Sequence, residues 1–234
     1  MKYITFTIPC YNSENYMRRC VDSLLVGGED VEILIIDDGS SDRTGAIADE
    51  YEMLYPNIVK AVHKPNGGHG SGVNKGLELA HGLYYKVVDS DDWFDRDAYL
   101  KMLDKIKSFE VAQYPDLIIC NYVYDHLDEG IQKPMNYRNV FPTEKMCNWN
   151  TIGHFHPSQY LIMHALMFQT KVLRQSGVKL PEHTFYVDNL FSYQPLHQDF
   201  LVDRLIFPSK VVMIQVNIHI VEILRIRKRL IGKQ

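Results

Sequence analysis

The chain has 234 residues, of which 46% are hydrophobic, and this is enough for one domain with a substantial buried core. Its formal net charge of −4 provides no overall basic field, which excludes nucleic acid as an expected partner. The four cysteines show no CxxC spacing, which argues against a zinc or redox motif. The sequence shows no signal segment and no membrane-spanning apolar run, so we expect a cytoplasmic protein.

The first half of the chain alternates strand patterns with helix patterns. Runs of β-branched and aromatic residues predict buried strands over residues 3–8, 31–36, 58–63 and 84–88. Apolar residues at helical spacing predict helices over residues 16–25 and 73–80. A further helix is expected between the second and third strands, ending at about residue 55, and another begins near residue 96 after the fourth strand. We expect Pro9 to end the first strand and Asn12 or Ser13 to cap the first helix. The alternation predicts an α/β fold, with a mostly parallel central sheet flanked by helices.

Acidic residues follow two of these strands where each strand ends. Asp37 and Asp38 come after residues 31–36, and Asp89 and Asp91 come after residues 84–88. Ligands of such sheets bind beyond the carboxyl ends of the strands, so we expect the acids to collect there. If the backbone stays extended, Asp89 and Asp91 point the same way and suit Mg²⁺ or Mn²⁺ together with substrate phosphates. The alternative is an acidic turn in which Asp92 caps the helix that begins near residue 96.

Two further motifs allow both a functional and a structural interpretation. The stretch Asp37-Asp38-Gly39-Ser40 either accepts hydrogen bonds from a nucleotide base or ribose, or forms only a turn with a helix cap. The glycine-rich stretch from Asn66 to Gly72 either lets the backbone approach a ligand closely or forms a flexible connector. It matches neither GxGxxG nor GxxxxGK[ST].

Taken in order, four motifs resemble those of the family 2 glycosyltransferases, which have the GT-A fold. The motifs are Thr7-Ile8-Pro9-Cys10-Tyr11-Asn12, the stretch 36–42, Asn66-Gly67-Gly68 with Asn74 and Gly76, and Asp89-Ser90-Asp91-Asp92. The resemblance covers most of the first 110 residues. One departure is Val73, since the family commonly has Arg immediately before the Asn of its third motif.

The resemblance implies a site for a nucleotide sugar, and we expect a UDP-sugar. In this site Asp37 or Asp38 recognises the base, and Asp89-Ser90-Asp91 is the DxD motif, in which Asp89 and Asp91 hold the sugar diphosphate through Mn²⁺ or Mg²⁺. The other implied donor-binding residues are Pro9, Tyr11, Asn12, Asn66, Gly67, Gly68 and Asn74.

Beyond Lys107 the pattern is less regular, and we expect this half to face the acceptor. Residues 116–124 predict a strand, residues 127–141 a loop or hairpin, and residues 161–167 a core segment. His154 and His156 alternate as metal ligands can, but no third ligand is evident, so we favour an acceptor-side loop. Thr170 is expected to cap a short helix that ends before Gly177.

Asp188 is the candidate catalytic base. The segment from Pro181 to Asn189 resembles the family stretch that carries this base, and the alternative is that Asp188 only caps the helix that follows. After Leu196 the resemblance fades. The apolar residues 211–231 predict a strand and a terminal helix. The helix contains the basic residues Arg225, Arg227, Lys228 and Arg229. We favour that these side chains stay solvated, and the alternative is that they contact anionic lipid at the inner face of a membrane.

The sequence thus predicts a metal-dependent, inverting glycosyltransferase that acts on a hydroxyl of a saccharide or lipid-linked acceptor. Residues 1–110 are expected to form its nucleotide-sugar-binding half, residues 111–200 its acceptor-binding half, and residues 201–234 an atypical or truncated tail. One alternative is a protein that binds nucleotide sugars without catalysis. A nucleotidyltransferase is a weaker alternative because Pro9-Cys10-Tyr11-Asn12 is no glycine-rich basic loop, and a signalling receiver domain leaves Asp89-Ser90-Asp91 unexplained.

Overall fold

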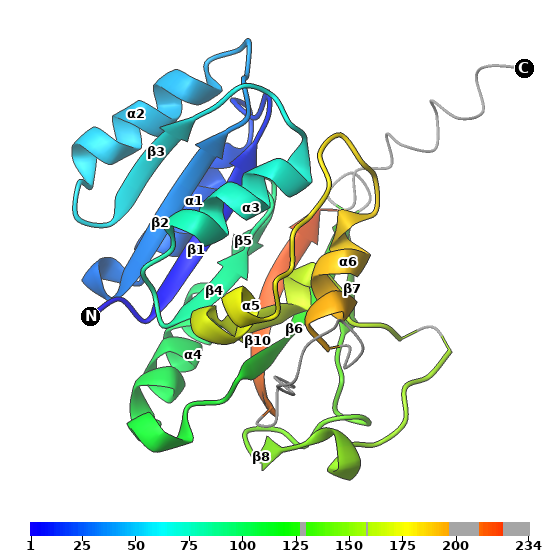
Figure 1. Ribbon diagram of the computed structural model, residues 1–234. Helices are drawn as coiled ribbons and strands as arrows, with labels where there is room; N and C mark the ends of the chain where they lie inside the picture. Colours follow the sequence, from blue (N-terminus) through cyan, green and yellow to red (C-terminus); the bar gives the residue numbers. More distant parts are fainter. Residues whose placement is uncertain (127–129, 158, 197–210, 222–234) are drawn as a thin grey trace, which may run out of the picture.

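Four parallel strands form the N-terminal half of a sheet (Figure 1). The computed structural model describes residues 1–126, 130–157, 159–196 and 211–221. In spatial order these four strands are β3 (Val59–His63), β2 (Val31–Asp37), β1 (Ile4–Cys10) and β4 (Tyr84–Val87). Every residue of β1 is buried, as expected for a central strand covered on both faces. The predicted strands and their parallel arrangement are confirmed.

Strand β1 continues through Pro9 to Cys10, so the prediction that Pro9 ends the strand is wrong. Strand β4 pairs with β1 only from Ile4 to Thr7, whereas β2 pairs with β1 as far as Cys10. Pro9 therefore lies beyond the β4 pairing, where its missing N–H breaks no bond to β4.

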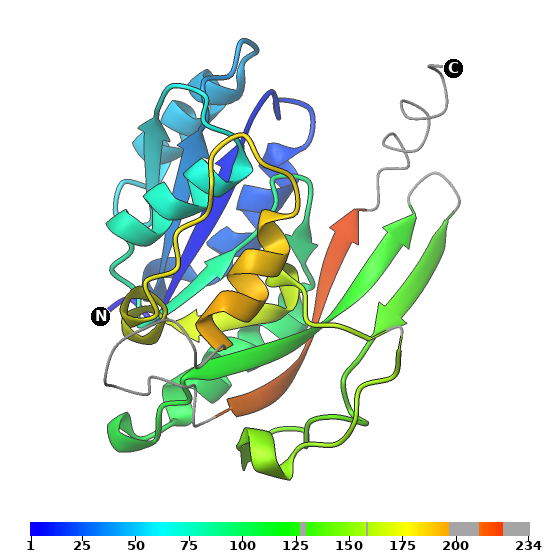
Figure 2. The same cartoon turned by 45° about the vertical axis from the view of Figure 1, so that its right-hand side comes forward.

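The helices between these strands are α1 (Met17–Leu25), α2 (Thr44–Leu54), α3 (His69–Leu79) and, after β4, α4 (Arg96–Ser108). In both views α3 lies on the face of the sheet that also carries α6 (Val187–Tyr193) (Figure 2). Helix α3 begins earlier than the predicted Val73, because the stretch from His69 to Gly72 is already helical.

One predicted helix cap, at α1, and one alternative that the sequence left open, at α4, are wrong. Helix α1 begins after Tyr16 without a side-chain cap, and the side-chain oxygen of Asn12 instead accepts a hydrogen bond of 2.9 Å from the backbone N–H of Ser41. At α4 the capping residue is Asp95, which accepts from the N–H of Ala98 at 2.9 Å, so Asp92 is no cap.

The second half of the chain extends the same sheet. Strand β9 (Leu166–Gln169) pairs antiparallel with β4 and with β6 (Leu117–His126), and β10 (Val211–Val221) lies parallel to β6. The remaining strands are β5 (Trp93–Phe94), β7 (Ile131–Met135) and β8 (Met146–Cys147). Since β6 and β7 pair antiparallel, the predicted hairpin is confirmed, and β10 confirms the strand predicted in the C-terminal segment. The basic residues Arg225, Arg227, Lys228 and Arg229 of the predicted terminal helix lie outside the described residues.

Short helical elements connect these strands. They are α5 (Thr170–Gln175) and the 3-10 helices Gly28–Asp30, Val111–Gln113, Trp149–Thr151, Met163–Ala165 and Gln194–Leu196. Thr170 does not cap α5, because its hydroxyl donates to the carbonyl of Gly82 at 2.6 Å and the capping position is Gln169.

The predicted core segment 161–167 is confirmed, since Leu161, Met163, Ala165, Leu166 and Met167 are buried. No helix in the described part of the chain is long and apolar enough to cross a membrane.

Candidate active site

The acid-rich stretch after β4 forms a turn. The backbone N–H of Asp92 donates to the carbonyl of Asp89 at 3.0 Å, and residues 90 and 91 form the turn between them. The premise that the backbone stays extended past Val88 is therefore wrong. The hydroxyls of Ser90 and Ser13, both buried, lie 3.0 Å apart and tie this turn to the segment before α1.

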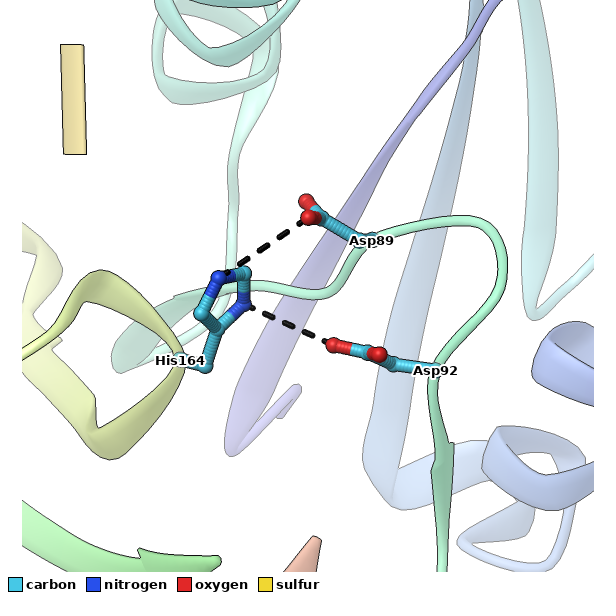
Figure 3. Close-up of side chains that lie close together, drawn as sticks. All are labelled: Asp89, Asp92 and His164. Carbon is cyan, nitrogen blue, oxygen red and sulfur yellow. Dashed lines mark ion pairs between the residues drawn. The ribbon is translucent and has the colours of Figure 1, made fainter. Parts of the chain in front are cut away.

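The turn brings Asp89 and Asp92 to His164, which lies in the 3-10 helix before β9 (Figure 3). The imidazole Nε2 is 3.8 Å from Oδ2 of Asp89, and Nδ1 is 3.5 Å from Oδ2 of Asp92. One ligand atom from each of the three residues lies within 4.8 Å of the others, a spacing that suits a metal ion. The sequence prediction missed His164, whose one available signal was a single histidine within an apolar run.

A second histidine contacts Asp89. His69, the first residue of α3, has Nε2 3.0 Å from Oδ1 of Asp89. Burial opposes charging of His69, but the charge of Asp89, its hydrogen bond and the charges of Asp188 and Asp38 together raise the pKa of His69. Likewise burial favours the neutral form of Asp89, yet His164 and His69 lower its pKa below the usual range. Asp89 is thus a carboxylate held between two imidazoles.

Asp91 has a different environment from Asp89. Burial, followed by the negative charge of Asp89, raises the pKa of Asp91 to about 6. A guanidinium N–H of Arg19 donates to the backbone carbonyl of Asp91 at 3.4 Å. Asp89 and Asp91 are therefore close enough to repel each other, although Asp91 does not belong to the cluster of Asp89, Asp92 and His164.

The acids after β2 are buried and bonded within the chain. Asp37 accepts from the N–H of Ser40 at 3.0 Å and has its other oxygen 2.9 Å from Nδ1 of His63. Asp38 accepts from the backbone N–H groups of Gly67 at 3.0 Å and Gly68 at 2.7 Å. Both acids thus shape the rim of the sheet, and their predicted contact with the base stays a prediction.

The glycine-rich stretch and α3 position the segment that leads to Asp188. The carbonyl of Gly67 accepts from the N–H of His183 at 2.9 Å. The side-chain amide of Asn74 donates to the carbonyl of Leu180 at 2.8 Å and accepts from its N–H at 3.0 Å. Gly68 has a φ of +81° and its Cα faces the backbone of His183, so a side chain there would be strained and crowded. The third motif therefore docks onto the 180–186 segment.

Asp188 lies in the first turn of α6 and does not cap it. The capping residue is Tyr186, with a φ of +64°, and no side chain caps this helix. The alternative that Asp188 only caps the helix is therefore wrong, and its role as a base stays a prediction. The negative charge of Asp188 is among the causes that raise the pKa of His69, which itself contacts Asp89.

The remaining predicted donor-binding residues lie around the same rim. Pro9 is buried against Gly72 of α3, and Tyr11 is 55% exposed. Asn66 donates through its side chain to the carbonyl of Asp38 at 2.9 Å. Val73 is buried in the core, so the position that commonly carries Arg supplies no cation here.

The alternative of a metal site at His154 and His156 finds no support. Both side chains are exposed, and in the part of the chain that the structure describes neither belongs to a group with metal-ligand spacing.

A family profile matches the segment that contains this rim. The profile described as Glycosyl transferase family 2 matches residues 5–168, which include both acid-rich turns, the glycine-rich stretch and His164. The chain belongs to glycosyl transferase family 2. The predicted family is thus confirmed.

Curated relatives agree with this family assignment. Poly(ribitol-phosphate) beta-glucosyltransferase of Bacillus spizizenii is 38% identical over 184 residues, which cover 77% of this chain and 27% of that protein. Glycosyltransferase GlyA of Streptococcus pneumoniae is 33% identical over 129 residues, which cover 55% of this chain and 18% of that protein. The matched part of this family 2 chain thus spans less than a third of the length of either relative.

Solved structures share the fold of this family 2 chain. Residues 1–349 of TarS from S. aureus, in complex with UDP-GlcNAc, match with a TM-score of 0.69 at 18% identity, over 95% of this chain and 59% of that one. The mannosyltransferase PcManGT from Pyrobaculum calidifontis, in complex with GDP-Man and Mn²⁺, matches with a TM-score of 0.58 at 14% identity, over 92% of this chain and 56% of that one. The predicted GT-A fold is confirmed.

Proposed function

We propose that this chain carries the active site of an inverting glycosyltransferase, which moves a sugar from a UDP-sugar to a hydroxyl of a saccharide or lipid-linked acceptor. The observation that carries the proposal is the position of His69. It is bonded to Asp89, and its helix α3 binds, through Asn74, the segment that leads from Leu180 to Asp188, so the DxD acid and the candidate base fit one site.

The residues present fit a divalent cation. Asp89 and Asp91 repel each other and neither is paired with a lysine or arginine side chain among the ion pairs of the described residues, so a cation would relieve their repulsion. Asp89 and Asp91 would hold this cation, and Mn²⁺ or Mg²⁺ accepts such oxygen ligands. A bound cation supplies charge that stabilises the departing diphosphate.

Asp188 is the residue that takes the proton in this proposal. The acceptor hydroxyl attacks the anomeric carbon from the side opposite the diphosphate, the bond between that carbon and the diphosphate oxygen breaks, and Asp188 accepts the hydroxyl proton. The side chain of Asp188 is partly exposed, which allows an acceptor to reach it. The contacts of Asn74 with Leu180 and of Gly67 with His183 hold the preceding segment against α3.

Relatives and neighbours support the choice of donor and acceptor class. TarS binds UDP-GlcNAc and UDP in its crystal structures, which supports a UDP-sugar here. The similarity to a poly(ribitol-phosphate) beta-glucosyltransferase supports an acceptor hydroxyl within a polymer such as poly(ribitol-phosphate).

A cytoplasmic location is part of the same proposal. All four cysteines are free and buried, which fits a reducing compartment. Contact of the basic tail with the inner face of a membrane stays a prediction.

The first test is a panel of nucleotide sugars, measured by the melting temperature with and without Mn²⁺. A ligand that binds only the native state raises stability by about 2.7 kcal/mol at a hundred times its dissociation constant. We expect UDP-sugars to raise the melting temperature, and to do so more strongly with Mn²⁺. A panel in which no nucleotide sugar shifts the melting temperature would contradict the proposed function.

A further inference from the structure

His164 is held in a position that the DxD motif alone does not explain. Its Nε2 lies 3.8 Å from Oδ2 of Asp89, beyond the range of a normal hydrogen bond. Two ligands about 2.1 Å from one cation lie about 3 Å apart at right angles and about 4 Å apart on opposite sides. The separation of these two atoms therefore suits two ligands of one cation better than a direct bond.

The other ring nitrogen of His164 faces a buried carboxylate. Nδ1 is 3.5 Å from Oδ2 of Asp92, whose side chain is only 2% exposed, whereas the side chain of Asp89 is 34% exposed. Metal-binding histidines commonly direct their second nitrogen at a carboxylate, which fixes the tautomer and the ring orientation. With Nδ1 on the side of Asp92, Nε2 of His164 faces the more open Asp89 (Figure 3).

The backbone of His164 is fixed by a buried lysine. Lys86 of β4 is fully buried, and its Nζ donates to the carbonyls of His164 at 2.6 Å and Leu166 at 3.4 Å. Burying a lysine ammonium group costs free energy unless its N–H groups donate hydrogen bonds, so the bonds from Lys86 to these carbonyls stabilise the fold and fix the backbone at His164. They join the strand that precedes the acidic turn to the 3-10 helix that carries His164.

We propose that Nε2 of His164 is a protein ligand of the same divalent cation that Asp89 binds, and that Asp92 is the carboxylate that orients the imidazole. This inference rests on the proposed function, because the cation is the one that holds the donor diphosphate. An imidazole nitrogen suits Mn²⁺, Co²⁺ or Zn²⁺ better than it suits Mg²⁺ or Ca²⁺, which prefer oxygen. The chain should therefore favour Mn²⁺ over Mg²⁺ when UDP is bound.

The competing account makes His164 a positively charged partner of Asp89 in place of a metal. The two accounts predict opposite changes in metal affinity when His164 is replaced. If His164 is a ligand, removing its nitrogen weakens metal binding, whereas if it is a charged partner, its removal frees Asp89 and leaves metal binding equal or tighter.

The test is a titration of MnCl₂ into the full chain in the presence of excess UDP, for the wild type, His164→Gln and the control His154→Gln. His154 is exposed, so its variant controls for the loss of a histidine. We expect His164→Gln to weaken Mn²⁺ binding about tenfold or more, the size of effect seen when a metal site is disturbed, and to change Mg²⁺ binding less. Pulsed electron paramagnetic resonance should show nitrogen coupled to bound Mn²⁺ in the wild type and in His154→Gln but not in His164→Gln.

Equal or tighter Mn²⁺ binding by a folded His164→Gln, or nitrogen coupling that persists in it, would overturn the inference and leave the proposed function intact. A wild type that binds no UDP with any cation would instead contradict the proposed function, and with it this inference. If His164→Gln does not fold, Asp92→Asn decides the matter, because it keeps the imidazole and changes only the group that orients it. Weaker Mn²⁺ binding by Asp92→Asn is then expected, and unchanged binding would overturn the inference.

Discussion

Asp38 organises the glycine-rich stretch through its carboxylate. The side chain is only 4% exposed, and besides two backbone N–H groups it contacts Lys64 Nζ at 2.5 Å. The resemblance assigned base recognition to Asp37 or Asp38, whereas the contacts give Asp38 a structural task that the sequence did not reveal. The reason is distance along the chain, since the partners of Asp38 belong to a loop that follows the next strand.

We predict that Asp38→Asn destabilises the fold. The substitution leaves the partly buried Lys64 without its charged partner and weakens the bonds to Gly67 and Gly68, and hydrogen bonds to charged groups contribute about 1.5–3 kcal/mol each. Urea unfolding should show a loss of about 2 kcal/mol or more. The matched control is Asp104→Asn at an exposed position of α4, where the change should stay within about 0.5 kcal/mol. Equal stabilities of the two variants would show that these contacts of Asp38 contribute little.

At the scale of elements, His63 links β3 to β2 and α2. Its ring contacts Asp37 at 2.9 Å through Nδ1 and Asp49 at 2.9 Å through Nε2. Hydrogen bonds first to Asp37 and then to Asp49 raise the pKa of His63 above its ordinary 6.5. The pair of acids thus favours the charged imidazole in the folded chain.

The stability that His63 contributes should depend on pH. A group whose pKa is raised on folding stabilises the native state fully below its unfolded pKa, and this contribution is lost as the pH rises through the folded pKa. We expect the difference in melting temperature between the wild type and His63→Gln to be largest below about pH 6 and to shrink above about pH 7, in line with the direction of the pKa shift. The control His154→Gln should show no such trend, and a constant difference for His63→Gln across this range would refute the role of its charge.

Strands and local turns differ in how far the sequence could predict them. Strands β1, β2 and β4 consist almost wholly of buried residues, so their β-branched and aromatic composition located them. Strand β3 lies at the edge of the sheet and is only partly buried, and its short run from Val59 to His63 sufficed to locate it. The early start of α3 at His69 and the turn after Asp89 depend on contacts with Asp89, His183 and Ser13. Such contacts join distant segments, and neither periodicity nor local propensity contains them.

At the scale of the whole molecule, the candidate site is built from both halves of the chain. Asp89 and His69 come from the first half, whereas His164 and Asp188 come from the second. The antiparallel strand β9 joins β4 to β6, and this places His164 beside the acidic turn. The motifs predicted Asp89 as a site residue, but the position of His164 follows from strand pairing that the sequence pattern did not reveal.

The most direct test of the proposed function compares transfer and binding in the wild type and Asp188→Asn. A general base acts on the acceptor, so Asp188→Asn should retain UDP-sugar and Mn²⁺ affinity while the transfer of radiolabelled sugar to a panel of hydroxyl acceptors falls by roughly a hundredfold or more. The helix should tolerate the change, because Asp188 caps nothing, and the melting temperature checks this. If Asp188→Asn transfers sugar at the full rate, Asp188 is not the catalytic base. If the wild type binds UDP-sugars but transfers sugar to no acceptor, the proposed catalysis is contradicted and the protein only binds nucleotide sugars.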